Sequence, residues 1–127
     1  MSRRPLGFDD VRELARALPD VEETTGRRGP GLKVRGKLLA CPAIHKSAEP
    51  YSLVVKIGFD QRAELIAADP DVYYVTDHYV DYPSVLARMS RIDRQSLQDL
   101  LLSAWQFVTK ETKTKKRGIR KRDEDAR

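Results

Sequence analysis

The sequence lacks disulfide pairs, long apolar runs and an apolar leader. Cys41 is its only cysteine, which excludes an internal disulfide, a secreted disulfide framework and a cysteine-rich zinc site. No apolar run approaches the roughly 18 residues that span a bilayer, and residues 1–7 do not have the apolar segment of a signal peptide. We therefore expect a cytoplasmic protein that makes no membrane contact.

Recognisable catalytic motifs are missing as well. His45 and His78 have no carboxylate at a metal-ligand or triad spacing, and the glycine-rich segment 26–31 lacks the Gly-Lys-Ser/Thr ending of a phosphate loop. Cys41 has only Lys46 near it in sequence to lower the pKa of its thiol, so we interpret it as a small buried hydrophobic residue. The sequence predicts a protein that is not an enzyme and that holds no cofactor.

Composition favours one folded domain with a basic tail. The 127 residues are 40% hydrophobic and 34% charged, so the chain can bury roughly two-thirds of its unfolded surface around one core. Beyond Lys110 the apolar periodicity stops, and a basic segment of this kind buries too little surface to offset its ordering entropy. We predict a domain over residues 1–110 and a basic, disordered tail over residues 111–127.

The net charge of +5 lies entirely near the C-terminus. Residues 110–127 contain nine Lys or Arg and four Asp or Glu, whereas residues 1–109 contain fifteen of each sign. The domain is therefore formally neutral. Any bulk attraction for phosphate must come from the tail or from uneven placement of charge on the domain surface.

Apolar periodicity predicts helices at both ends of the domain. Residues 8–18 place apolar side chains at intervals of three and four, with acids in the first turn, until Pro19 ends the pattern. Asp93 is the expected N-cap of the clearest helix, which carries an apolar stripe that includes Leu97, Leu101 and Trp105. A shorter helix is expected over residues 61–68, with Asp60 as its cap.

Alternating patterns between these helices predict strands. We expect extended segments at residues 21–25, 32–41, 52–58, 72–79 and 84–89. Either residues 32–41 form one strand, or Arg35-Gly36-Lys37 turns the chain and makes a hairpin of two. Consecutive strands without helices between them imply antiparallel pairing, so the predicted class is α+β, with helices on one face of the sheet and water on the other.

Several short segments together resemble a known family. They are Leu18-Pro-Asp-Val-Glu-Glu-Thr24, Gly31-Leu-Lys-Val-Arg-Gly-Lys-Leu-Leu39, Ala67-Ala-Asp-Pro70, His78-Tyr-Val-Asp-Tyr-Pro-Ser-Val85 and the helix around Trp105. In this order and spacing they are similar to the small bacterial MmcQ/YjbR family, over about residues 8–110. The resemblance implies an antiparallel sheet with flanking helices, like the double wing of frataxin-like CyaY. It also implies the DNA-binding label that members carry, which is an argument by fold analogy.

A frataxin-like fold raises the question of a metal site on the first helix. Asp9, Asp10 and Glu13 share that helix, but Arg12 and Arg16 alternate with them, where an acidic site for a cation needs neutral or acidic neighbours. We therefore predict no metal site and expect these acids to stabilise the helix start and to form ion pairs within the helix.

The candidate nucleic-acid interface is the open face of the sheet. Basic residues alternate with apolar ones, and an adjoining loop and two rings of matching strand parity extend the surface. The predicted phosphate-binding residues are Lys33, Arg35, Lys37, Lys56, Arg88, Arg27 and Arg28, and the stacking candidates are Tyr74 and His78. The alternative is a solvated face whose cations pair with acids such as Glu22 or Asp77.

The tail is the second candidate for weak, non-specific nucleic-acid binding. Its basic residues include Lys113, Lys115, Lys116, Arg117, Arg120, Lys121 and Arg122; the alternative is a solubilising end without a binding role. Two other functions stay open. The tyrosines from Tyr73 to Tyr82 are candidates for docking a protein partner, and a groove beside the glycine-rich loop is a candidate for a small anionic ligand.

Overall fold

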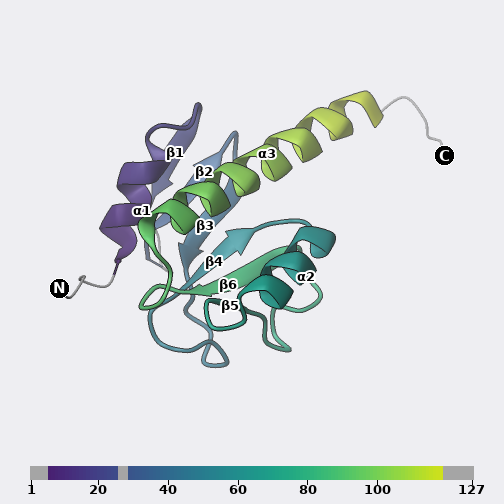
Figure 1. The fold of residues 1–127 in the computed structure, drawn as a ribbon. Helices are drawn as coiled ribbons and strands as arrows, with labels where there is room; N and C mark the ends of the chain where they lie inside the picture. The colour runs from purple at the N-terminus through teal and green to yellow at the C-terminus, as the bar shows by residue number, and fades with distance from the viewer. Residues whose placement is uncertain (1–5, 26–28, 119–127) are drawn as a thin grey trace.

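The chain forms an antiparallel sheet with helices against one of its faces (Figure 1). The structure is a computed structural model that describes residues 6–25 and 29–118, with side chains described as far as Lys110. In chain order its elements are α1 (Phe8–Ala15), β1 (Val21–Thr24), β2 (Gly31–Val34), β3 (Lys37–Pro42), β4 (Ser52–Lys56), α2 (Phe59–Ala68), β5 (Tyr73–Tyr74), β6 (Ser84–Arg88) and α3 (Arg94–Gly118).

The strands follow the order β1-β2-β3-β4-β6-β5, and every neighbouring pair is antiparallel. Sequential strands joined by short links pair directly, as the sequence predicted. The only departure from sequential order is at β5, which pairs outside β6. The α+β class is confirmed.

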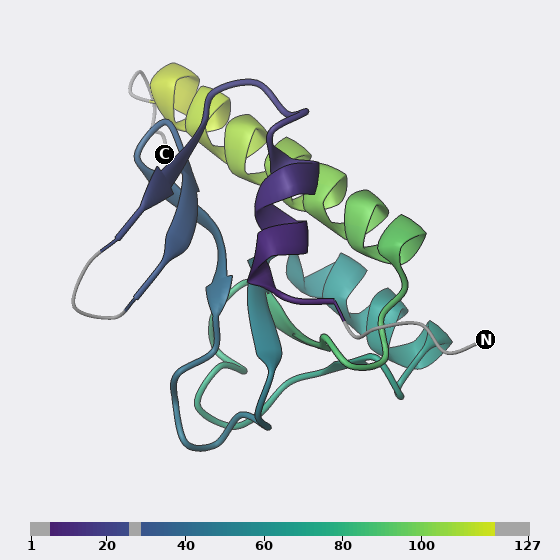
Figure 2. The same ribbon diagram turned by 90° about the vertical axis from the view of Figure 1, so that its left-hand side faces the viewer.

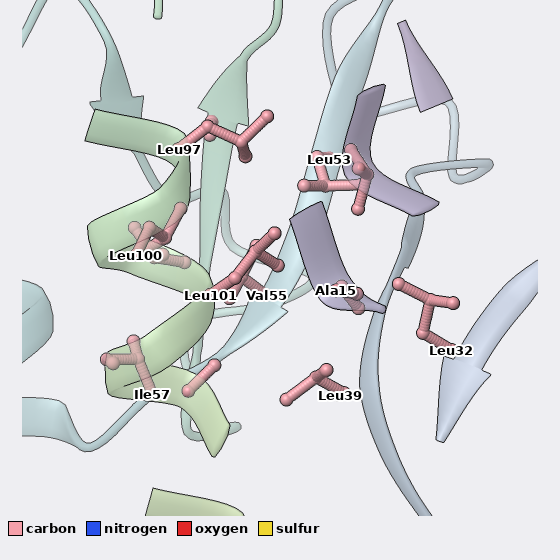
Figure 3. Close-up of a cluster of buried hydrophobic side chains, with 14 of the residues drawn as sticks. Ala15, Leu32, Leu39, Leu53, Val55, Ile57, Leu97, Leu100 and Leu101 are labelled. Atoms are coloured by element: carbon pink, nitrogen blue, oxygen red, sulfur yellow. The ribbon is translucent and has the colours of Figure 1, made fainter. Parts of the chain in front are cut away.

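Helices α1, α2 and α3 lie on the same face of the sheet, and α3 runs across the middle strands (Figures 1 and 2). The core forms between them. Figure 3 shows leucines of α3 on one side of this core and strand residues such as Leu53 and Val55 on the other. Leu97 and Val55 are fully buried, so α3 is the main packing element that its apolar stripe predicts.

The acids of α1 serve the helix start, as predicted, but the expected ion pairing within the helix is seen for Asp9 with Arg12, whereas Glu13 pairs with α3. Asp10 is only 3% exposed; its carboxylate accepts a hydrogen bond from the Gly7 backbone N–H (2.8 Å) and one from Arg94 of α3 (3.3 Å). Glu13 pairs with the same arginine (3.0 Å), and Asp9 pairs with Arg12. The first helix is thereby fixed to the start of the last.

The turn at Arg35-Gly36 makes two strands of residues 31–42, which confirms the hairpin alternative. Both residues have positive φ, 52° and 83°, and glycine adopts that region without the Cβ clash that other residues suffer. A register irregularity beside Leu32 and Lys33 then shifts the pairing with β3. As a result, the adjacent residues Leu39 and Ala40 are both buried.

The largest differences from the predicted element ends are at α1, α2, β5 and α3. Helix α1 ends at Ala15, before the predicted Leu18, and α2 begins at Phe59, where Gly58 and not Asp60 is the N-cap. The predicted strand 72–79 shrinks to Tyr73–Tyr74, because backbone bonds such as Tyr79 N–H to the Thr76 carbonyl fold the next residues into turns. Helix α3 continues to Gly118, past the expected end at Lys110.

Candidate functional site

Strand register decides which basic residues share the face of the sheet opposite the helices, called here the open face. Lys56 pairs with Ser84, and its neighbour Val55 points to the core. Lys33 lies between the buried Leu32 and Val34. Because successive side chains in a strand alternate between faces, both lysines lie on the open face, as predicted.

Lys33 and Lys56 also lie near the same level of the sheet, on either side of β3. Lys33 pairs with Leu38, and Ala40, two residues further on, pairs with Val55. With a strand spacing of about 4.8 Å, their backbones are about 10 Å apart. Neither lysine has an ion pair within the described residues, although Glu22 is the cross-strand partner of Lys33.

Arg35 and Lys37 do not join this pair, which corrects the predicted strand parity. Arg35 lies in the turn, where its guanidinium donates two hydrogen bonds to the Asp20 carboxylate (3.1 and 3.0 Å). Lys37 pairs with Val34, a fully buried residue on the helix side of the sheet. The two-residue turn at Arg35-Gly36 breaks the simple alternation on which the prediction depended.

Arg88 lies on the open face, but its charge is used within the protein. Its guanidinium donates to both Glu49 carboxylate oxygens (2.9 and 2.7 Å) and to the carbonyls of Pro70 and Asp71 (3.0 and 3.1 Å), and lies 4.2 Å from the Tyr74 ring centroid. The hydrogen bond with Arg88 lowers the pKa of the Glu49 carboxyl, and the same bond raises the pKa of Arg88. This arginine therefore clamps the loop after β3 onto the sheet.

The two predicted stacking rings are occupied by contacts inside the protein. Tyr74 lies beneath Arg88, and its hydroxyl is hydrogen bonded to Ser52 and to the Glu49 backbone N–H. His78 lies in a turn, not in a strand; its ring stacks on His45 with centroids 3.5 Å apart and planes 6° apart. Neither ring presents two free faces to a nucleic-acid base.

Part of the open face is shielded from solvent, which corrects the expectation that this whole face contacts water. Leu86 is fully buried and Val54 is 6% exposed, although their register places both side chains on this face. Loops 43–51 and 75–83 approach each other over these strands, joined by the His45–His78 stack and a 2.8 Å hydrogen bond between the Ser47 and Thr76 hydroxyls. They lie over this part of the face and leave a hollow beside it.

This hollow, called here the sheet cavity, has a volume of about 860 Å³. Its lining comes from β2, β3 and β4, from the glycine-rich segment and from both covering loops, and it includes Lys33, Leu38, Cys41, His45, Val54 and Tyr79. No Asp or Glu is among its described lining residues. The volume is within the range of small-molecule sites, roughly 300–1,000 Å³.

Burial shifts the pKa values of two side chains in the cavity wall, His45 and Tyr79. The Tyr79 ring meets His78 edge-on, with centroids 4.7 Å apart, and His45 Nδ1 accepts a hydrogen bond from the Ser47 backbone N–H (3.0 Å). Burial, together with the charges of His78 and Lys46, lowers the pKa of His45, and burial raises the pKa of the Tyr79 hydroxyl. Both groups therefore favour their neutral forms at neutral pH.

Sequence reasoning predicted a groove for a small anionic ligand beside the glycine-rich loop, but not the other residues that line the sheet cavity. Cys41 was expected to be buried, but it is only partly covered and lines the cavity. The glycine-rich loop did point to a groove beside it, and Gly29, Pro30 and Gly31 do line the cavity. No sequence signal could show that His45 and His78 meet, because they lie on separate loops.

The other predicted basic residues lie outside what the structure describes. Arg27 and Arg28 fall between residues 25 and 29, and Arg120, Lys121 and Arg122 follow residue 118. The α3 backbone is described through Lys113, Lys115, Lys116 and Arg117, but their side chains are not. These residues stay candidates on the strength of their charge.

The tyrosines proposed for partner docking are mostly internal. Tyr73 is 6% exposed, and Tyr74 and Tyr79 make the contacts given above, so only Tyr82 exposes more than half of its surface. Within residues 6–25 and 29–118 no group of three or more His, Cys, Asp or Glu is arranged to hold a metal ion. In the same ranges no helix combines the length and apolar character needed to cross a bilayer.

Comparisons with known proteins agree with this architecture. The model of the YjbR family matches residues 16–107. A crystal structure of a Deinococcus radiodurans protein with the family-model domain DUF419 has a TM-score of 0.69 and 22% identity, and the match covers 88% of this chain and 85% of that one. This second likeness concerns the fold alone.

Similar proteins also occur in mycobacteria. Uncharacterized proteins of Mycobacterium bovis and Mycobacterium tuberculosis are 44% identical to this chain over 41 residues. That segment covers 32% of this chain and 32% of each relative, so the matched part is about a third of the relatives' length.

Proposed function

The chain belongs to the YjbR family, and from this membership and its charge distribution we propose that it binds nucleic acid weakly and largely without sequence preference. The basic C-terminal segment, residues 110–127, is the main contact in this proposal. The domain acts by binding and not by catalysis, and we propose a cytoplasmic location, where DNA and RNA are accessible in bacteria.

One observation carries the proposal: the whole net charge of the protein lies in the C-terminal segment. Residues 110–127 carry a formal charge of +5, and residues 1–109 are neutral. A neutral domain has little long-range attraction for a phosphate backbone, whereas a compact group of Lys and Arg displaces counterions from it. Residues that neutralise phosphates confer affinity but read no sequence.

The course of α3 supports this assignment. The helix continues to Gly118, and its last turns extend beyond the sheet (Figure 1). The first part of the basic segment is therefore attached to the domain through a helix and is held away from the neutral surface. Such an arm can follow a phosphate backbone without requiring the domain itself to fit the groove.

Lys33 and Lys56 provide a secondary contact on the open face. Both lack ion pairs within the described chain, and Lys33 is exposed. Two phosphate contacts add less to affinity than the larger group at the C-terminus. Arg35 and Arg88 are excluded from the proposed interface because carboxylates already bind their guanidinium groups.

The test uses fluorescence anisotropy with duplex and single-stranded DNA of equal length, at several salt concentrations. If roughly five phosphates are contacted, the logarithm of the binding constant falls with the logarithm of salt at a slope of about −4 to −5. Glutamine at positions 113, 115, 116 and 117 removes four charges and keeps good helix propensity. This full-length variant should bind much more weakly, with a slope reduced by about 3 to 4.

A matched control separates the arm from the sheet. The double variant Lys33→Gln and Lys56→Gln should lower the slope by no more than about 2. Absence of binding by the wild-type protein at low salt would remove the proposed function. Equal binding by the wild-type protein and the four-glutamine variant would instead remove the arm as its main contact.

A further inference from the structure

Within the described residues, the sheet cavity combines an apolar floor, an aromatic wall and one lysine, Lys33. We propose that it binds a small organic anion with a flat apolar body, such as an aromatic carboxylate. This site is separate from the C-terminal segment and does not depend on nucleic-acid binding.

The floor suits a flat apolar group. Leu38, Cys41 and Val54 come from the adjacent strands β3 and β4 and line the cavity. Cys41 and Val54 are cross-strand partners, and neighbouring side chains on one sheet face stand about 5 Å apart, which makes a continuous surface. Covering that surface removes apolar area from water at about 25 cal/mol per Å².

The wall adds rings in a fixed arrangement. His45 and His78 stack with nearly parallel planes, and Tyr79 packs edge-on against His78. The ring nitrogen Nδ1 of His45 accepts a hydrogen bond from the Ser47 backbone N–H. The Ser47 hydroxyl is in turn hydrogen bonded to the Thr76 hydroxyl on the other loop. These rings are already ordered in the protein. Packing a ligand against them therefore costs little further side-chain entropy of the protein.

Charge selects an anion over a cation or a neutral molecule. Lys33 lines the cavity and has no ion pair within the described residues. No carboxylate lines the cavity within the described residues. The cross-strand partner of Lys33 is Glu22 on β1, which forms no ion pair with it among the described contacts and does not line the cavity. One carboxylate per ligand is therefore the matching charge.

A chemically matched pair of probes tests the site in the intact protein. Naphthalene-2-acetate carries a flat apolar body and one carboxylate, and naphthalene-2-acetamide is its neutral counterpart. Isothermal titration calorimetry should show that the acid binds at millimolar or lower concentration and more tightly than the amide. In Lys33→Gln the acid should bind about two- to fivefold more weakly, the usual effect of one exposed ion pair, and the amide should be unaffected.

Two further substitutions locate the site. Leu38→Trp fills the cavity and should abolish binding, whereas Leu102→Trp, at a position on α3 that is 42% exposed, should not change it. Lys56→Gln removes a lysine on the same face that does not line the cavity and should leave the affinity unchanged. Circular dichroism verifies that each variant is folded.

Three results of these titrations would contradict the proposed anion site. Absence of acid binding, equal affinity for acid and amide, or equal loss of affinity in Lys33→Gln and Lys56→Gln would each overturn the proposal. If Leu38→Trp does not fold, the two lysine variants still decide, because both side chains reach solvent and neither is required for packing.

Discussion

Replacement of Arg88 by methionine tests whether this residue holds the fold together or contacts a ligand. The side chain is 22% exposed and joins three parts of the chain. It binds the carboxylate of Glu49 in the loop after β3, the carbonyls of Pro70 and Asp71 before β5, and the ring of Tyr74. Methionine retains much of the apolar stem and removes all of the donors.

The expected loss of stability follows from these contacts. A net hydrogen bond contributes about 0.5–1.5 kcal/mol. Each hydrogen bond of Arg88 contributes at the low end of this range, because water can rehydrate the carbonyls and the carboxylate once the arginine is gone. We expect Arg88→Met to lower the free energy of unfolding by about 2 kcal/mol. With an unfolding entropy of about 2 cal/mol/K per residue, the Tm should fall by about 8 °C.

The assay is urea and thermal unfolding followed by circular dichroism, with Arg91→Met as the matched control. Arg91 lies beside the same small depression, but its side chain makes no hydrogen bond or ion pair within the described residues. The control should change the Tm by less than about 2 °C. Equal Tm values for the two variants would refute the clamp, as would weaker DNA binding by Arg88→Met without loss of stability.

The pH dependence of the stability difference between wild type and Arg88→Met provides an independent check. The pKa of Glu49 is lowered in the folded protein by its hydrogen bond with Arg88. Its stabilising contribution is therefore present above its unfolded-state pKa and is lost as the pH falls through the folded-state pKa. The gap in stability between wild type and Arg88→Met should narrow in acid; a gap that widens there would contradict the assignment.

Three further predictions concern the open face and its loops. Leu86→Ala should lower the free energy of unfolding, measured in urea, by about 3 kcal/mol, because Leu86 is fully buried. The control Ile44→Ala, at a 61% exposed position, should lower it by no more than about 0.5 kcal/mol. Equal effects of the two substitutions would show that the loops do not cover Leu86. The pKa of His45 is lowered by burial and by the charges of His78 and Lys46, so its contribution to stability is present above its ordinary pKa, near 6.5, and is lost as the pH falls through the lower folded-state value. His78→Asn should flatten the stability profile below about pH 6.5, and an unchanged profile would exclude this coupling. Gly36→Ala should lower the free energy of unfolding by about 1 kcal/mol because φ at this position is 83°; no measurable change in Tm would argue against this turn.

The main elements could be predicted because their signals are local. Apolar residues at intervals of three and four indicated α1 and α3, and the N-cap at Asp93 is present as a 2.7 Å bond from the Ser96 backbone N–H. Alternation indicated β2, β3, β4 and β6, and short links implied their antiparallel pairing. Helix ends were harder to predict. The last part of α3, up to Gly118, has no apolar stripe from which its helical structure could be predicted.

The candidate site was predicted only where strand alternation held. Lys33 and Lys56 lie on the open face because each follows a regular strand up to that point. Lys37 follows the two-residue turn and pairs with Val34, so counting residues from Lys33 no longer predicts its face. His78 was assigned to a strand because Val and Tyr are common in strands, but its surroundings are turns.

By itself the sequence determined the α+β class, the neutrality of the domain and the position of the positive charge at one end, because composition and periodicity are properties of the chain alone. Tertiary structure decided which charges are free and which are used. Glu49 and Arg88 are 39 residues apart in the chain and meet at 2.7 Å, and His45 meets His78 over the sheet in the same way. Contacts between distant segments depend on how the whole sheet brings loops together, and no local pattern encodes that.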